Sequence, residues 1–387
     1  MNGFAKRFFK IESGETAKVI HFGLLGAFLQ AGLSVGITTA DALFLSTVGP
    51  SKLPLIYLLT PVIMLGYTPI YAYFISQKGM RWVLDVTLMI LAGGGVVFFL
   101  ATSWASGFAG GLVYYLAKLY TALWYIALYS LFWNFADNFF DIQDGKRLFA
   151  FFSGGLALGG IVGGALVTEL ADYVKAEHLF LLWSVIAAIT IPLCRRIQAK
   201  WNPVDGDDFA ENSRASVWRE TRQTVSVIKG SRYALLLIGL FFTNLLATTL
   251  CEYQYMGIFS TGRSSEDLAR LFGSLYAGVN VLNLTVNFFV FNRLVLRIGV
   301  RNTALIQPVV YLAAFFLYRF DYGMAAGVMG FFAYQGFLTS IDYNNSNFLF
   351  NALPGQWKQR MRTLIEGLCE PCAAAAVGVF LLVAQNH

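Results

Sequence analysis

Long apolar stretches alternate with short polar stretches along the whole chain. A helix needs about 20 mostly apolar residues to cross the hydrocarbon core of a bilayer. About eleven stretches meet this criterion, and they cover residues 19–47, 53–76, 82–102, 108–138, 148–170, 177–194, 233–259, 268–292, 302–319, 323–350 and 364–385. The pattern therefore predicts an all-α membrane protein whose helices nearly all span the bilayer.

One long polar stretch interrupts this pattern. Residues 195–231 begin as a charged loop and continue as an amphipathic helix. The stretch predicts a division into an N-terminal helical bundle at 1–194, a cytoplasmic linker at 195–231 and a C-terminal helical bundle at 232–387. Another amphipathic helix is predicted at 1–18, where it would lie at the membrane interface before the first span.

The two halves of the sequence resemble each other in the order and spacing of several segments. The matching segments are Trp133-Asn134 with Tyr343-Asn344, Phe140-Asp141 with Phe350-Asn351, and Lys78-Gly79-Met80-Arg81 with Ile298-Gly299-Val300-Arg301. Parallel repeats of this kind build many secondary transporters. The sixth apolar stretch predicts a twelfth helix beyond His387, so the sequence leaves open eleven spans or a natural chain that continues further.

Composition and charge agree with a membrane protein and indicate its orientation. Only 13% of the residues are charged and 57% are hydrophobic, whereas a soluble domain carries roughly 25% charged residues. Most of the 28 basic residues fall in alternate loops, among them the N-terminus and the central linker. Because cytoplasmic loops are enriched in Lys and Arg, we predict a cytoplasmic N-terminus. The net charge of +6 is explained by these basic loops, which indicate the orientation of the protein in the membrane. No nucleic-acid partner is expected.

Three stretches of the sequence resemble a known transporter family. They are residues 37–57, 140–149 and 343–362. They are similar to the major facilitator superfamily, and more closely to its ATP/ADP translocase branch, the nucleotide transporters of plastids and intracellular bacteria with their broader bacterial relatives. This resemblance implies two bundles of six helices each, one from each half, and a bacterial inner (cytoplasmic) membrane as the location.

The first helix departs from the nucleotide-exchanging members of that branch. Those members resemble Arg-Asp-Thr-Lys-Asp at five positions that read Ile37, Thr38, Thr39, Ala40 and Asp41 in this chain. Both basic residues are replaced, while the threonine and the last acid remain. The resemblance therefore supports the fold more strongly than it supports nucleotide exchange.

Polar side chains inside the predicted spans are the candidate binding groups. The resemblance implies that helices one, four, seven and ten line a central cavity, and these are the helices with the most polar residues. Lys118 is the one deep cation and lies at a depth where it could pair with Asp41. The candidate substrate-binding residues are Asp41, Lys118, Tyr115, Trp124, Asn244, Glu252, Gln335, Asp342 and Asn344. The alternatives are a structural ion pair, and tyrosines and asparagines that only hold helices together.

Two further patterns predict contacts between helices. The fifth helix has glycines spaced four residues apart, such as Gly155, Gly159 and Gly163, and such spacing lets helices approach closely. No strand precedes these glycines, so a phosphate-binding loop is not predicted. Asn280, Asn283 and Asn287 recur at helical spacing, and we expect them to bond across helices.

The sequence contains no pattern typical of an enzyme or a cofactor site. The three histidines form no metal-binding spacing with the four cysteines, and no nucleophile constellation is present. The first functional hypothesis is a secondary transporter that moves a small polar or anionic solute by alternating access, with nucleotide-like solutes included. The alternative is a transporter-like structural or assembly subunit of a larger membrane complex. The expected partners are the lipid bilayer, a small solute and, in the alternative, other membrane subunits.

Overall fold

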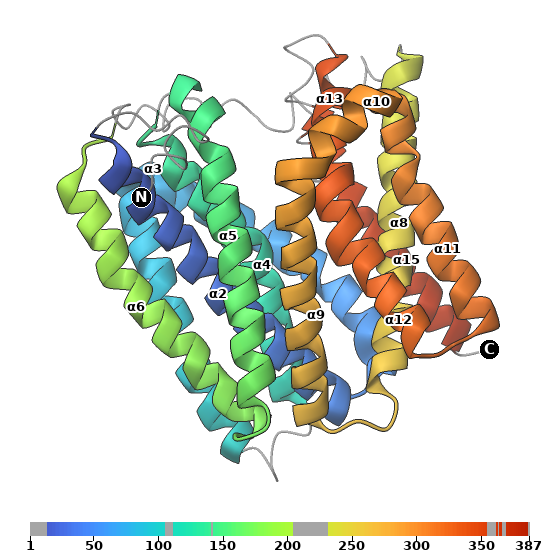
Figure 1. The fold of residues 1–387 in the computed structure, drawn as a ribbon. Helices are drawn as coiled ribbons and strands as arrows, with labels where there is room; N and C mark the ends of the chain where they lie inside the picture. The colour runs from blue at the N-terminus through green and yellow to red at the C-terminus, as the bar shows by residue number, and fades with distance from the viewer. Residues whose placement is uncertain are drawn as a thin grey trace. The chain divides into compact units, whose positions relative to one another are not determined.

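The described residues form mainly long helices, several of which are joined by short turns (Figure 1). The computed structural model describes residues 14–104, 111–140, 142–203, 231–353, 361–362, 364–365 and 369–385. The described part of the chain has no β-strand. The amphipathic helix predicted in the linker lies outside the described residues, and so does the one at 1–18 apart from its last five positions.

The described residues of the N-terminal half form five long helices and two short 3₁₀ turns. They are α2 (Thr16–Thr47), η1 (Pro50–Lys52), α3 (Leu53–Trp104), α4 (Leu112–Asp137), α5 (Ile142–Leu170), η2 (Ala176–His178) and α6 (Leu179–Lys200). The C-terminal half has more interruptions. Its elements are α8 (Arg232–Ser260), α9 (Ser265–Thr285), the π-helix η5 (Val286–Val290), α10 (Phe291–Ala304), α11 (Ile306–Phe320), α12 (Met324–Phe331), the π-helix η6 (Phe332–Asp342), α13 (Tyr343–Asn351) and α15 (Glu370–Gln385).

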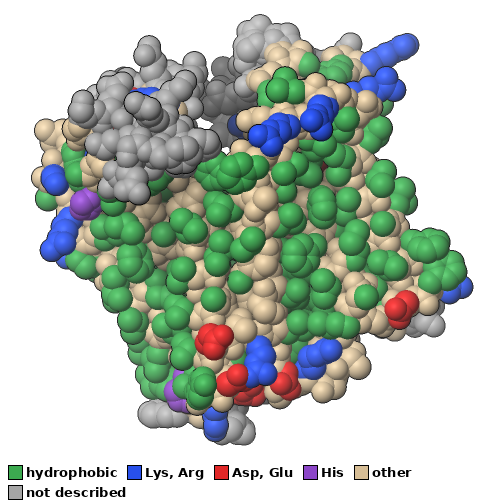
Figure 2. All heavy atoms as spheres, viewed as in Figure 1, with side chains coloured by type: hydrophobic (Ala, Val, Ile, Leu, Met, Phe, Trp, Pro, Cys, Tyr) green, Lys and Arg blue, Asp and Glu red, His purple; other side chains and the backbone are tan. Residues whose placement is uncertain are grey.

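The helices have the length and composition of membrane spans. Within the described residues, 7 helical segments are long and apolar enough to cross a membrane, and two shorter apolar helices accompany them. Figure 2 shows hydrophobic side chains over the middle of the visible helices and charged side chains near the helix ends. Leu236, Leu296 and Leu312 are among the most exposed hydrophobic side chains in the described part of the chain. The protein is an integral membrane protein, and its surface fits contact with lipid.

Two glycines divide longer helices into separate spans. Gly79 interrupts α3 with φ 77° and ψ 163°. Gly299 interrupts α10 with φ 79° and ψ 161°. This backbone region is essentially restricted to glycine. The two glycines occupy the matching loop motifs of the sequence repeat, so their shared conformation confirms that the repeat is structural.

The chain forms two compact units, each built mainly from one half of the sequence. Unit 1 comprises residues 1–48, 66–210 and 264–281, and unit 2 comprises residues 49–65, 211–263 and 282–387. Each unit thus takes the first part of the second helix of the other half. The exchanged segments 49–65 and 264–281 are equivalent in the repeat, so the exchange is reciprocal.

Glycines on α5 allow close packing inside unit 1. A Cβ atom added to Gly155 would lie 2.6 Å from the carbonyl oxygen of Gly23 on α2. A Cβ atom on Gly164, on a second stripe of the same helix, would lie 2.5 Å from the carbonyl oxygen of Gly273 on α9. Neither position has room for a side chain, which confirms the close approach that the glycine spacing predicts.

Candidate functional site

A buried ion pair joins α2 to α4 in unit 1. Lys118 donates through its Nζ atom to Oδ1 of Asp41. Asp41 is 1% exposed and Lys118 is 8% exposed, and no other charged side chain is buried in the part of the chain that the structure describes. The pairing predicted from the depths of the two residues is confirmed. Charges are costly inside a bilayer, and each member of this pair neutralises the other.

Threonines surround this ion pair along the two helices. The Thr39 hydroxyl donates to the carbonyl oxygen of Val35 at 2.7 Å, and the Thr121 hydroxyl donates to the carbonyl oxygen of Lys118 at 3.0 Å. The hydroxyl of Thr38 is fully buried and has no hydrogen-bond partner among the described residues. Residues 37–41, which depart from the sequence of the nucleotide-exchanging members, carry no charge except that of Asp41.

Aromatic residues of α3 and α4 form a cluster in the same unit. The rings of Tyr67 and Tyr71 stack with centroids 5.6 Å apart. Trp124 packs edge-on against Tyr67 at 6.1 Å and against Tyr120 at 5.8 Å. Asn134 donates a hydrogen bond from Nδ2 to the Tyr71 hydroxyl at 3.2 Å. Trp124 is therefore buried among aromatic neighbours, whereas Tyr67 and Tyr71 are partly exposed.

Tyr115 lies on the α4 face that contacts α2. Its ring meets the ring of Phe44 edge-on, with centroids 5.3 Å apart. Phe44 is fully buried and Tyr115 is half-buried. The ring of Tyr115 thus contributes to helix packing, one of the two roles that the sequence left open for the tyrosines.

In unit 2, α8 meets the end of the π-helix η6 through a polar contact. Asn244 donates from Nδ2 to Oδ2 of Asp342 at 3.0 Å. One helical turn further along α8, the hydroxyls of Thr248 and Tyr311 are 2.6 Å apart. Glu252 lies another turn along α8 and is half-buried. Asn244 and Asp342, candidate residues from helices seven and ten, are therefore in direct contact.

The π-helix η6 carries Gln335 and leads into Asn344. Its hydrogen bonds run from i to i+5, which widens the turn and changes the direction of the side chains that follow. Asn344 donates from Nδ2 to Oδ1 of Asn287 at 2.8 Å. Gln335 is buried, with 8% of its surface exposed. Isolated π segments are frequent at functional sites, and this one contains or adjoins three of the candidate residues.

The three asparagines of the eighth predicted span behave differently from one another. Asn283 accepts a hydrogen bond from the Thr339 hydroxyl at 3.1 Å, and Asn287 accepts one from Asn344. Asn280 instead donates to the carbonyl oxygen of Tyr276, one turn back on its own helix. The expected bonding across helices is confirmed for two of these residues and is wrong for Asn280, whose amide satisfies its own backbone.

Sequence reasoning missed a polar face on α11. Gln307 donates from Nε2 to the carbonyl oxygen of Ala333 at 2.9 Å, and Tyr311 contacts Thr248. The Tyr318 hydroxyl lies 3.4 Å from the Cys251 sulfur. The sequence did contain a signal for this face, because the polar residues are spaced along one side of an otherwise apolar helix. This spacing alone could not predict which residues of other helices they contact.

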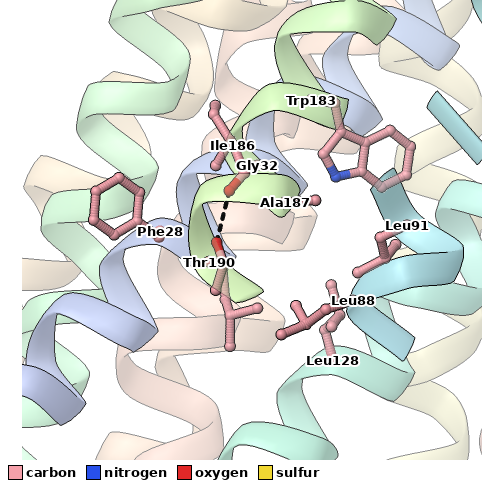
Figure 3. A pocket seen from close by; sticks show the side chains of 10 residues that line it. Phe28, Gly32, Leu88, Leu91, Leu128, Trp183, Ile186, Ala187 and Thr190 are labelled. Carbon is pink, nitrogen blue, oxygen red and sulfur yellow. Dashed lines mark hydrogen bonds between the residues drawn. The ribbon is translucent and has the colours of Figure 1, made fainter. Parts of the chain in front are cut away.

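A small apolar cavity in unit 1 lies apart from these residues. Figure 3 shows Phe28, Leu88, Leu128 and Trp183 around it, contributed by α2, α3, α4 and α6. The Thr190 hydroxyl donates its proton to the carbonyl oxygen of Ile186 at 2.7 Å, so it offers no donor to a solute. The cavity has a volume of about 10 Å³, close to that of one water molecule. It is a packing gap rather than a solute site.

The candidate residues divide between the two units. Unit 1 holds Asp41, Tyr115, Lys118 and Trp124, and unit 2 holds Asn244, Glu252, Gln335, Asp342 and Asn344. Among the described residues, no group of His, Cys, Asp and Glu could hold a metal ion. What each unit offers is a set of hydrogen-bonding and aromatic groups, together with an ion pair in unit 1 and a carboxyl group bonded to an amide in unit 2.

Comparison with solved structures identifies the fold. The nucleoside transporter NupG matches with a TM-score of 0.60 and 13% identity, covering 94% of this chain and 89% of that chain. The xylose transporter XylE from E. coli in an inward-open conformation matches with a TM-score of 0.61 and 11% identity, covering 96% of this chain and 91% of that chain. A bacterial homologue of the human lysosomal transporter Spinster matches with a TM-score of 0.58 and 12% identity, covering 95% of this chain and 81% of that chain. This chain therefore has the major facilitator fold that the sequence resemblance implied.

Comparison with sequence families narrows the relationship further. No curated protein matches this chain. The family model described as TLC ATP/ADP transporter matches residues 96–333, well over half of the chain. The match includes the aromatic helix α4, the glycine-rich helix α5 and part of η6. With the major facilitator fold and this match together, the chain belongs to the TLC ATP/ADP transporter family.

Proposed function

We propose that this protein is a secondary transporter that moves a small polar or anionic solute across the membrane by alternating access. Nucleotide-like solutes are the first class to test, because the family model bears the name of ATP/ADP transporters and the fold is similar to that of a nucleoside transporter. The observation that carries the proposal is the buried pair of Lys118 and Asp41. Ionisable groups within the membrane are costly, and they often mark the path of a solute or an ion.

The ion pair supplies a cation that a solute can reach by exchange. An anionic group that approached Lys118 could replace the Asp41 carboxylate as its partner, provided that Asp41 then gained a proton or another donor. Phosphate and carboxylate groups suit this role because charge-assisted hydrogen bonds to them are strong. A solute with many negative charges would require more cations than Lys118 alone supplies. The site therefore favours a solute with few negative charges.

The candidate residues of unit 2 supply hydrogen-bonding groups that suit a polar solute. Asn244, Gln335 and Asn344 can donate and accept hydrogen bonds, and Glu252 and Asp342 can accept them. In unit 1, Tyr115 and Trp124 offer aromatic faces and edges to a planar group.

We further propose that the N-terminus and the linker at 195–231 lie in the cytoplasm, and that the membrane is the bacterial inner membrane. The concentration of Lys and Arg in alternate loops supports this orientation. The division into 1–194, 195–231 and 232–387 remains our proposal for the two sequence repeats and their linker.

Thermal stabilisation of the purified protein tests the proposed transport. The probes are uridine, AMP, ATP, orthophosphate and citrate, each added to the protein in detergent. A ligand present at 100 times its dissociation constant adds about 2.7 kcal/mol to the stability of the state that binds it. We expect at least one probe to raise the melting temperature of the wild type and to lose this effect in Lys118→Met. The matched control Lys175→Met removes an exposed cation outside the helices and should respond like the wild type.

Reconstitution into liposomes then separates binding from transport. A stabilising probe should exchange across the membrane with its labelled form when the wild type is present. Absence of both stabilisation and exchange for every probe would contradict the proposal and favour the structural-subunit alternative. A solute that stabilises Lys118→Met as strongly as the wild type would show that the cation does not bind it.

A further inference from the structure

Three arginines occupy α10, where the eighth predicted span ends and the ninth begins. Arg293 and Arg297 are four positions apart, so they are neighbours on one face of the helix. Arg301 follows the break in the helix at Gly299. All three side chains are exposed. The segment 293–301, which we call the arginine turn, therefore presents three cations to its surroundings.

In the described part of the chain, these cations have no acidic partner. None of the three arginines forms an ion pair with a described acidic side chain. The sequence contains no Asp or Glu between Asp267 and Asp321. The elements packed most closely on α10 are η5, η6, α11 and α13, and Asp342 is the one acidic residue that they contain. The positive charge of the turn is therefore available to an anionic group from outside the protein.

Exposed apolar side chains accompany the arginines. Leu296 lies three positions after Arg293, on the same side of the helix, and is 86% exposed. Val290 before the turn and Leu305 after it are also exposed. Figure 2 shows Lys and Arg side chains over α10 and hydrophobic side chains on the neighbouring helices. This combination fits a membrane interface, where cations meet lipid headgroups and apolar side chains meet acyl chains.

The pair of arginines on the helix face is specific to the second half of the sequence. In the register that aligns the two loop glycines, the arginine after the break corresponds to Arg81. Arg293 instead corresponds to Tyr73, and Arg297 corresponds to Gln77. Orientation in the membrane depends on the number of basic residues on each side and requires no particular spacing. The paired spacing is therefore not explained by orientation alone.

We propose that the arginine turn binds the headgroup of an anionic phospholipid. The lipid phosphate accepts hydrogen bonds from the guanidinium groups of Arg293 and Arg297, whose planar arrays of N–H donors match phosphate oxygens. Arg301 adds a third positive charge, and an acyl chain lies against Leu296. Basic residues next to a span attract anionic lipids. The exposed leucine favours a phospholipid over a free phosphate, because a free phosphate would leave this side chain in water. The site goes beyond the proposed transport function and does not depend on the solute.

Lipid titration tests this site in the purified full-length protein. In a nonionic detergent, phosphatidylglycerol should raise the melting temperature, whereas phosphatidylcholine with the same acyl chains should not. Each basic residue near an anionic lipid contributes about fivefold in affinity, so Arg293→Gln with Arg297→Gln should raise the apparent dissociation constant about 25-fold. The matched control is Arg196→Gln with Lys200→Gln, an exposed basic pair with the same spacing at the end of α6. The control should bind phosphatidylglycerol like the wild type.

Three results of this titration would overturn the proposal. They are equal responses to the two lipids, unchanged binding in the arginine variant, and equal weakening in the two double variants, which would indicate general attraction to anionic lipid. Glycerophosphoglycerol, the same headgroup without acyl chains, should give no stabilisation at the lipid concentrations used. Equal stabilisation by this headgroup would assign a site for a soluble phosphate compound instead of a lipid.

A variant that keeps all charges tests the apolar contact separately. Leu296→Ser should weaken the binding of phosphatidylglycerol because it removes the side chain that meets the acyl chain. Since this leucine is exposed, the variant should fold, and it tests the site even where the arginine variant does not fold. Unchanged binding of phosphatidylglycerol in Leu296→Ser would contradict the lipid assignment.

Discussion

Lys118 on α4 and Asp41 on α2 neutralise each other inside unit 1, and each is the other's oppositely charged partner within the membrane-spanning part. The pair is separated by a long stretch of sequence, so it fixes the two helices against each other. In the proposed transport function, an anionic solute would compete with Asp41 for Lys118 and open the pair. Substitutions can decide whether the pair stabilises the contact between α2 and α4, binds the solute, or does both.

Replacing the lysine by methionine should destabilise the protein strongly. Lys118→Met keeps a similar length of side chain but leaves the Asp41 carboxylate buried without its cation. Breaking a buried pair in this way typically costs on the order of 3–5 kcal/mol. The free energy of unfolding in detergent, or the melting temperature, measures the loss.

The double variant Lys118→Met with Asp41→Asn is the matched control. It removes both charges and keeps two side chains of suitable size, so most of the lost stability should return. Stability unchanged in Lys118→Met would show that the lysine does not neutralise Asp41. Recovery of stability without recovery of solute binding would assign both a structural and a binding role to Lys118.

A larger side chain on the glycine face of α5 should prevent the close contact with α2. A Cβ atom at Gly159 would overlap the backbone carbonyl group of Ala27, which cannot move away as a flexible side chain can. Overpacking typically costs about 1–3 kcal/mol, and a clash with backbone lies at or above that range. Gly159→Leu should therefore lower the yield of folded protein, measured by size-exclusion chromatography.

Gly93→Leu provides the comparison for this prediction. Gly93 lies in α3 of the same unit, and nothing comes within 4 Å of an added Cβ atom. This variant should fold like the wild type, because the leucine side chain extends into open space. Equal yields for Gly159→Leu and Gly93→Leu would contradict the close contact between α5 and α2.

The sequence predicted most of the fold because the membrane imposes simple rules. Apolar stretches of sufficient length gave the helices, and for α2 the observed Thr16–Thr47 differs from the predicted 19–47 only at its start. The boundary of α5 was less accurate. The helix begins at Ile142, before its apolar stretch, because polar residues at its start can continue the helix beyond the hydrocarbon core. Helix ends are set by local hydrogen bonds, which hydropathy does not report.

Pairing between distant residues was harder to predict. The contact of Lys118 with Asp41 could be expected because few charged residues lie deep in the spans and their depths agree. The contact of Tyr311 with Thr248 could not, because a tyrosine and a threonine are common in membrane helices and many pairings would satisfy both. The π-helix η6 was also unpredictable, since its extra residue per turn depends on packing rather than on composition.

The two loop glycines should respond alike to alanine. Gly79 and Gly299 occupy a backbone region that costs a residue with a Cβ atom about 1–3 kcal/mol. Gly79→Ala and Gly299→Ala should each lower the free energy of unfolding within this range. Gly66→Ala, in the helical part of α3 with open space around it, should instead be neutral or stabilise the protein by up to about 1 kcal/mol. A loss in only one of the two loop variants would indicate that the repeat does not extend to these turns.

The proposed orientation predicts that two engineered cysteines face opposite sides of the membrane. Lys175 is exposed in the turn between α5 and α6, and Asp207 belongs to the predicted linker outside the described residues. Of the four native cysteines, only Cys372 is exposed, so its replacement by alanine should leave a background with little labelling. Lys175→Cys should react with a membrane-impermeant maleimide in intact cells.

Asp207→Cys should react with the same reagent only after the membrane is permeabilised. The substitutions themselves should not alter the orientation. Removing Lys175 takes a basic residue from the outer side and so reinforces the charge bias, while acidic residues such as Asp207 contribute little to it. Labelling of both cysteines from the same side would refute the topology. Labelling of Asp207→Cys alone in intact cells would invert it and place the N-terminus outside, despite the concentration of Lys and Arg in the loops on its side.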